Sequence, residues 1–147
     1  MPPSPGRGTR GHRIGPHTAD CVIEAWGPDR CACLTEALRA LVEIFAEAKA
    51  PAGEVPVTQV PLCAEPGPDI GILVALLEEV IYTTDVIGVP VRFQLWDADD
   101  GGVRGFMEVA AHSCVEQVGP IPKAVSYHEI EIGPRDGAWR CRAVIDV

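Results

Sequence analysis

The stretch "EPGPDIGILVALLEEVIYTTDVIG", residues 65–88, has the pattern of a loop that leads into a long helix. Its apolar residues recur at helical spacing and cover most of the circumference: Ile70, Leu73, Val74, Leu76, Leu77, Val80 and Ile81. A helix that is apolar on nearly all sides must be enclosed by other elements. This segment is therefore predicted to form the buried centre of the fold.

A second helix is predicted on the N-terminal side of this segment. From Leu34 onward, apolar residues again recur at helical spacing, and Pro51 and Gly53 are expected to end the helix. The charged residues fall on its other side: Glu36, Arg39, Glu43 and Glu47. The pattern is that of an amphipathic helix.

The rest of the chain is typical of strands. They are predicted over residues 22–26, 55–64, 89–96, 103–111, 124–132 and 139–147. Pro56 and Pro61 cannot donate to a sheet ladder, so residues 55–64 should form an edge strand. "DADDGG" and "GPRDG" contain turn residues that tolerate positive φ, and each is predicted to close a hairpin.

The order of these elements indicates the fold class. Strand, helix, strand and helix are followed by four strands, which favours an α+β fold with two helices packed on a mainly antiparallel sheet. A chain of 147 residues is the size of one domain. The domain is predicted to span residues 16–147, and the Pro-, Gly- and Arg-rich residues 1–15 are predicted to be a disordered tail.

Composition limits the classes of partner. The chain has 12 Lys and Arg against 21 Asp and Glu, a formal net charge of −9, which disfavours direct nucleic-acid binding. Residues 1–13 contain no apolar stretch typical of a secretory signal, and no segment reaches about 18 apolar residues. These patterns predict a cytoplasmic protein that spans no membrane and whose six cysteines are reduced.

The cysteines and histidines allow other chemistry. Cys31 and Cys33 could ligate zinc, but a matching second pair is missing, and thiols that simply pack explain them as well. A Cys/His nucleophilic pair is conceivable, yet nothing local marks an activated thiol. The common nucleotide-binding and serine-hydrolase motifs are missing.

The "DADDGG" segment also fits a loose version of a calcium-binding loop. Counting from Asp97, position six is Gly102 and position twelve is Glu108. The flanking residues are typical of strands rather than helices, so a hairpin turn accounts for the same residues. Both interpretations stay open at this point.

Two acidic residues lie at the ends of predicted strands. Asp20 precedes the first strand, and Asp146 ends the last one. A carboxylate at the end of a buried strand must be paired, hydrogen-bonded or bound to a cation. If the first and last strands are neighbours, Asp20, Asp146 and the terminal carboxylate of Val147 could converge on a hard cation such as Ca²⁺ or Mg²⁺. Exposed acids at strand ends are the simpler alternative.

Several separated motifs resemble those of the archease family. They are "HTAD" at residues 17–20, "EAWG" at 24–27, "LVALLEEVIY" at 73–82, "KAVSYHEIEI" at 123–132 and "VIDV" at 144–147. The resemblance covers residues 15–147 and implies a single-domain archease-like fold. The chain departs from many archeases at Ala75 and Glu78, where the family often carries Asp and Asn.

The resemblance implies an activator rather than an enzyme. Archeases assist the RtcB-type RNA-splicing ligase, which uses GTP and a divalent metal in tRNA splicing and RNA repair. They promote guanylylation of the ligase and its repeated turnover. RNA is then contacted only through the ligase.

The resemblance also implies a metal site, usually described as a calcium site. Its ligands would be Asp20, Asp146 and Val147, and His17 could orient Asp20. In the "KAVSYH" motif, Lys123 could contact a phosphate or an acidic residue of the partner, whereas His128 and Tyr127 could equally pack within the sheet.

Two alternatives from other classes remain. A general chaperone or modulator of nucleic-acid-processing proteins would suit a buried central helix and an acidic surface equally well. A small metal-dependent hydrolase is less favoured, because two aspartates offer few ligands and no general base is evident.

Overall fold

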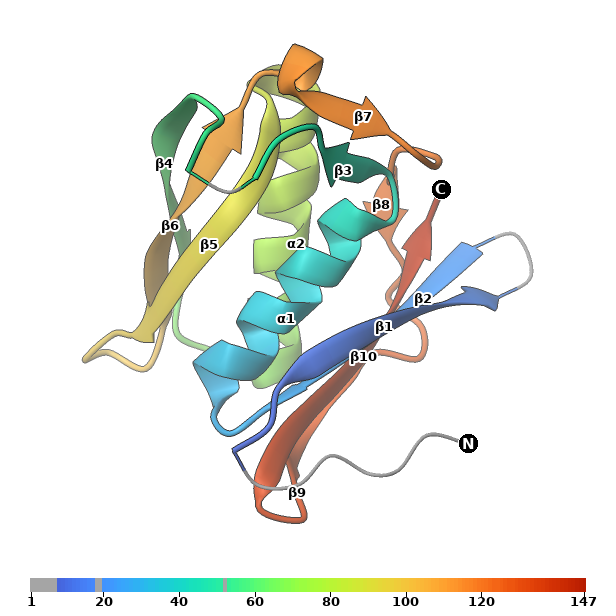
Figure 1. The fold of residues 1–147 in the computed structure, drawn as a ribbon. Helices are drawn as coiled ribbons and strands as arrows, with labels where there is room; N and C mark the ends of the chain where they lie inside the picture. The colour runs from blue at the N-terminus through green and yellow to red at the C-terminus, as the bar shows by residue number, and fades with distance from the viewer. Residues whose placement is uncertain (1–7, 18–19, 52) are drawn as a thin grey trace.

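The computed structural model describes residues 8–17, 20–51 and 53–147. Two helices, α1 (Arg30–Glu43) and α2 (Asp69–Val86), lie between two antiparallel sheets (Figure 1). This arrangement confirms the predicted α+β class, and it divides the predicted sheet into separate sheets. No helix in the described ranges is long and apolar enough to cross a membrane.

The larger sheet has the strand order β1-β2-β10-β8, with β9 also paired to β10. Its strands are β1 (Gly11–His17), β2 (Asp20–Gly27), β8 (Ala124–Val125), β9 (Glu131–Arg135) and β10 (Ala138–Asp146). Because β2 and β10 are direct neighbours, the first predicted strand lies beside the last one. The condition for bringing Asp20 and Asp146 together is therefore met.

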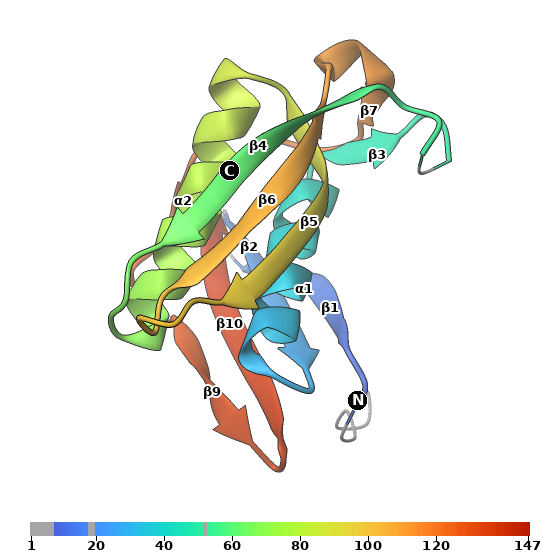
Figure 2. The same cartoon turned by 90° about the vertical axis from the view of Figure 1, so that its left-hand side faces the viewer.

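The second sheet has the order β4-β6-β5 and covers the other side of the helices (Figure 2). Its strands are β4 (Val57–Ala64), β5 (Val89–Asp97) and β6 (Val103–Ala110). The prediction of an edge strand is confirmed, because β4 pairs only with β6 in this sheet. A short third sheet pairs β3 (Ala46–Ala48) with β7 (Val115–Gln117), and a 3₁₀ turn at His112–Cys114 precedes β7.

Helix α2 is the buried centre that its sequence predicts. Leu73, Leu76, Leu77 and Val80 are fully enclosed. Ile70 is the exception, since 46% of its surface is exposed. It lies in the first turn, and the helix keeps one solvent-facing stripe along its length.

Helix α1 ends earlier than predicted. Asp29 caps its start, since the Asp29 side chain accepts a hydrogen bond of 2.8 Å from the Ala32 N–H. The helix stops at Glu43, and Ala46–Ala48 then form β3. Pairing with β7 and burial of Phe45 supply the tertiary contacts that override local helix propensity here.

The predicted tail is partly wrong. Residues 11–15, assigned to it, belong to β1, which pairs with β2 from Gly11 opposite Trp26 to His17 opposite Asp20. This edge strand has no apolar period, so apolar periodicity does not reveal it. A Cβ at Gly11 would lie 2.7 Å from the Trp26 ring, which shows how closely the two strands approach. The domain begins before residue 16, and residues 1–7 lie outside the described ranges.

The strand predicted over residues 124–132 is also wrong in its middle. The chain leaves the sheet after Val125 and returns at Glu131, with Glu129 at a positive φ of 60° between them. The hairpin in "GPRDG" is confirmed but shorter, because Asp136 and Gly137 form its turn with φ of 53° and 78°.

A candidate metal centre at the ends of β2 and β10

Asp20 and Asp146 occupy directly opposed positions on neighbouring strands. The antiparallel register of β2 and β10 pairs Asp146 with Asp20, and both residues are half-buried. Directly opposed side chains lie on the same face, with Cβ atoms about 4.5–5.5 Å apart. The two carboxylates, 126 positions apart in the sequence, therefore belong to one cross-strand pair.

This pair faces away from the helices. Ile23 and Ala25 of β2, and Ala143 and Ile145 of β10, pack into the core around α1 and α2. Successive side chains of a strand point to opposite faces, so Asp20 and Asp146 lie on the other face of the sheet. Within the described ranges, neither helix lies on this face of the sheet (Figure 1).

A third strand, β8, lies on the other side of β10 from β2. Asp146 also pairs with Ala124 of β8, and the Lys123 N–H donates a 2.8 Å hydrogen bond to the Asp146 carbonyl oxygen. Lys123 is exposed, while Val147 packs its side chain against the core. Packing of the Val147 side chain against the core orients the backbone that follows Asp146.

Like charges directly opposite one another destabilise a sheet, by roughly 0.2–1 kcal/mol for such pairs. A bound cation would remove this repulsion. Within the described ranges, no group of three or more His, Cys, Asp and Glu side chains could hold a metal. A cation here would thus rely on two carboxylates and main-chain oxygens, with the remaining positions left to water or a partner. Oxygen-only ligands fit a hard ion such as Ca²⁺.

The other predicted site residues are placed differently. His17 lies opposite Asp20 in the register, and its side chain is outside the described part of the structure. His128 is exposed in the segment between β8 and β9, where its N–H donates to the Ser126 hydroxyl at 3.3 Å. Tyr127 donates a 2.8 Å hydrogen bond to Glu78 of α2, and this bond raises the pKa of Tyr127.

The cysteine pair does not form a zinc site in the described structure. Cys33 is buried, with its thiol 3.6 Å from the Ala25 carbonyl, whereas the Cys31 thiol lies 3.6 Å from Asp97. Burial and the nearby Asp97 raise the pKa of Cys31 to about 12, which keeps it protonated. All six cysteines, which lie in the described ranges, are free thiols.

The "DADDGG" segment is a hairpin turn between β5 and β6. The Ala98 N–H donates to the Gly102 carbonyl at 2.9 Å, and Gly101 adopts a φ of 92°. Asp97 is paired with Arg30 at 2.7 Å. The strands on both sides favour the turn over a calcium loop, because such a loop is flanked by helices.

Sequence reasoning missed a buried polar cluster. Glu36 is only 3% exposed, although its position in the pattern indicated the polar side of the helix. Its carboxylate accepts from Arg10 at 2.7 Å, from His12 at 2.8 Å and from Arg39 at 3.2 Å, and His12 also contacts Glu43. Burial acts to raise the pKa of Glu36, but the bonds from His12 and Arg10 outweigh it and lower that pKa.

Two of the three basic residues of this cluster, Arg10 and His12, come from the segment assigned to the tail. Arg10 and His12 alternate along the chain, and this spacing was the available indication of a strand with one face toward the protein. Once β1 covers this side of α1, Glu36 is enclosed.

Comparison with known proteins decides the family. The model of the archease protein family matches residues 12–147. The chain belongs to the archease family. Archeases from two strains of Mycobacterium tuberculosis, each named "Probable protein archease", are 42% identical to it over 138 residues, which cover 93% of this chain and 75% of the relatives.

Solved archease structures share the fold. Protein 1598 of Methanobacterium thermoautotrophicum superposes with a TM-score of 0.69 at 22% identity, covering 93% of this chain and 99% of that one. An archease of Thermotoga maritima, described as a possible chaperone, gives a TM-score of 0.64 at 17% identity, covering 89% and 93%. The archease fold predicted from the motifs is confirmed.

Proposed function

We propose that this archease family member activates an RtcB-type GTP-dependent RNA ligase through a divalent cation, Ca²⁺ in the first instance, held by Asp20, Asp146 and a main-chain oxygen of Val147. The opposed pair of carboxylates at the ends of β2 and β10 is the observation that supports this proposal most directly. The link to RNA ligation is what the resemblance of the sequence motifs to archeases implies.

The acidic pair is suited to a cation that is shared with a partner. Two carboxylates provide fewer than the six to eight oxygens that Ca²⁺ takes. The site therefore leaves positions for oxygens from the ligase or from a nucleotide phosphate. Its place on the face without helices makes such a shared contact sterically reasonable.

Each residue has a separate part in this proposal. A divalent cation, when bound, supplies positive charge that can orient phosphate oxygens. Asp20 and Asp146 hold it from adjacent strands, and the rigid register keeps their spacing constant. Lys123 is tied to Asp146 through the backbone and presents its exposed ammonium group to a phosphate or an acidic side chain of the ligase.

The test is a ligation assay under multiple turnover. Ligase, GTP and RNA ends bearing a 2′,3′-cyclic phosphate and a 5′-hydroxyl are combined with a substoichiometric amount of the protein. Asp20→Asn and Asp146→Asn keep the shape of each side chain and remove its charge. Each variant is expected to lower the stimulation of turnover at least tenfold, because the cation loses a charged ligand.

Glu24→Gln is the matched control, since Glu24 lies on the same strand and face as Asp20 and pairs with Arg13 at 3.0 Å. It should leave the stimulation within about twofold of the parent. Full stimulation by both aspartate variants would refute the proposal.

A second candidate is a general chaperone or modulator of nucleic-acid-processing proteins. The description of the Thermotoga maritima archease as a possible chaperone favours it. Such a protein would suppress aggregation of unrelated clients, and stoichiometric amounts would be needed. Stimulation of ligase turnover by catalytic amounts, without protection of clients, separates the two functions.

A further inference from the structure

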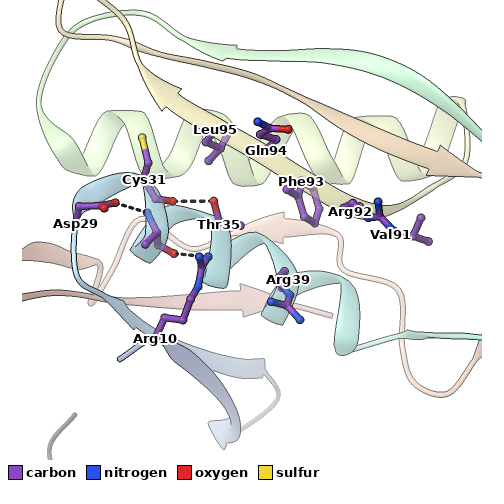
Figure 3. Close-up of a pocket in the computed structure, with 11 residues that line it drawn as sticks. Arg10, Asp29, Cys31, Thr35, Arg39, Val91, Arg92, Phe93, Gln94 and Leu95 are labelled. Carbon is purple, nitrogen blue, oxygen red and sulfur yellow. Dashed lines mark hydrogen bonds between the residues drawn. The ribbon is translucent and has the colours of Figure 1, made fainter. Parts of the chain in front are cut away.

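A groove runs between helix α1 and one edge of the β4-β6-β5 sheet. Its larger part is a cavity of about 650 Å³, lined on one side by residues 91–95 of β5 and on the other by α1 (Figure 3). A smaller cavity of about 210 Å³ continues it toward β3 and shares Arg39, Val91 and Phe93 with the first. Five consecutive β5 residues thus form one wall.

This wall is an open strand edge. β5 is the last strand of its sheet, and no strand of the described chain pairs with its outer side. The bond from Ala98 to Gly102 and the one-to-one register place the hydrogen-bonding groups of Arg92, Gln94 and Trp96 toward β6. The peptide groups of Phe93 and Leu95 therefore point into the groove, where they can bind another strand.

The β4 edge of the same sheet is protected against the addition of another strand, whereas the β5 edge is not. β4 carries Pro61 in its middle, which cannot donate to an added strand. On β5, Pro90 and the irregularity before Arg92 affect only the start of the strand. Residues 92–95 remain available.

The larger cavity of the groove has more basic than acidic lining residues in an acidic protein, whereas Glu43 and Glu47 line the smaller cavity. Arg10, Arg39 and Arg92 line the larger cavity, each with 45–54% of its side chain exposed, and Asp29 is the carboxylate among the lining residues. Arg39 and Arg92 each use one nitrogen in their contacts with Glu36 and Glu108. A guanidinium has five N–H donors, so both retain donors for an incoming carboxylate.

We propose that this groove binds an extended acidic segment of a partner protein, which adds to the edge of β5 as a fourth strand. Backbone hydrogen bonds to Phe93 and Leu95 hold the segment, and the arginines select its carboxylates. Residues 1–7 of the chain itself contain no Asp or Glu and do not match this charge. The proposal does not depend on ligase activation, since the groove opens beside Arg10, at the other end of β1 from Asp20.

The test is fluorescence anisotropy with the full chain and a labelled eight-residue peptide that alternates Glu and Thr. We expect saturable binding of this peptide and none of a Lys-Thr repeat. Methylation of alternate backbone nitrogens removes the hydrogen bonds that one side of the peptide donates, so it should weaken binding at least tenfold. The amide resonances of Phe93 and Leu95 should shift on binding.

The combined Arg39→Gln and Arg92→Gln variant should bind the Glu-Thr peptide about 3–10-fold more weakly, in line with half-exposed ion pairs. Arg104→Gln, an exposed arginine on β6 outside the groove, is the matched control and should bind like the parent.

Four results would overturn the proposal. The first is absence of binding at millimolar peptide, and the second is equal binding of the N-methylated peptide. The third is displacement by inorganic phosphate or oligouridine with no effect of methylation, which would assign a phosphate site. The fourth is a concentration-dependent dimer that buries the β5 edge, which would assign the groove to a second copy.

Discussion

Asp20 and Asp146 are the residues on which the proposed metal site depends. Their register was not evident from either motif alone, since it is a contact between distant strands. The resemblance to the archease family indicated that the two aspartates share one site. The physical argument from their places at strand ends left exposed, unpaired acids as an alternative. The structure places the two side chains on the same face of the sheet. That they bind a cation stays a prediction.

Thermal unfolding with and without Ca²⁺ measures this site without any ligase. In chelator, Asp146→Asn should be more stable than the parent by up to about 1 kcal/mol, because the opposed charges no longer repel. Ca²⁺ at 100 times its Kd should stabilise the parent by about 2.7 kcal/mol and the variant far less. Equal shifts of Tm by Ca²⁺ in both proteins would contradict the assignment.

Glu36 gives a prediction about pH. Its folded pKa is lowered, so its contribution to stability is present above the unfolded value of about 4.3 and is lost as pH falls through the folded pKa. Glu36→Gln removes the charge that Arg10, His12 and Arg39 share, and should cost about 1–3 kcal/mol at pH 7.

Urea unfolding at several pH values tests the contribution of the Glu36 charge to stability. The difference between the parent and Glu36→Gln should shrink below about pH 4, where the parent carboxyl becomes protonated. Glu47→Gln, at an exposed site, should stay within about 0.5 kcal/mol of the parent throughout. A difference that does not change with pH would show that the charge of Glu36 contributes nothing.

At the scale of elements, the helical spacing of apolar residues predicted a helix well where those same residues are buried. In α2, the spacing of Leu73, Leu76, Leu77 and Val80 is sufficient, because the same residues form the core. The end of α1 and the edge strand β1 could not be predicted in this way. The end of α1 depends on the pairing of β3 with the distant strand β7, and β1 pairs with its sequence neighbour β2 without an apolar period of its own.

The central role of α2 can be measured by truncation. Leu77→Ala removes a fully buried side chain and should lower the free energy of unfolding by about 2–5 kcal/mol. Ile70→Ala makes a similar change on the same helix at a site that is 46% exposed, and should cost less than about 1.5 kcal/mol. Equal losses in urea unfolding would mean that the two faces of α2 are not distinguished by burial.

At the scale of the whole molecule, the fold separates two surfaces. The acidic pair lies on the face of the larger sheet that, in the described part of the chain, has no helix, and the groove lies along the outer edge of the other sheet. A partner bound at the edge of β5 would therefore leave the acidic pair at the end of β10 free to contact another molecule. The sequence predicted the archease fold and the acidic pair, but not the groove, which three distant segments form together.

The central claim is that Asp20 and Asp146 together allow the protein to promote guanylylation of the ligase. The most direct measurement is the rate at which label from [α-³²P]GTP becomes attached to the ligase, with Ca²⁺ and without RNA. The parent protein and Glu24→Gln should accelerate labelling, whereas Asp20→Asn and Asp146→Asn should leave it near the rate of the ligase alone. Labelling by both aspartate variants at the parent rate would contradict the account.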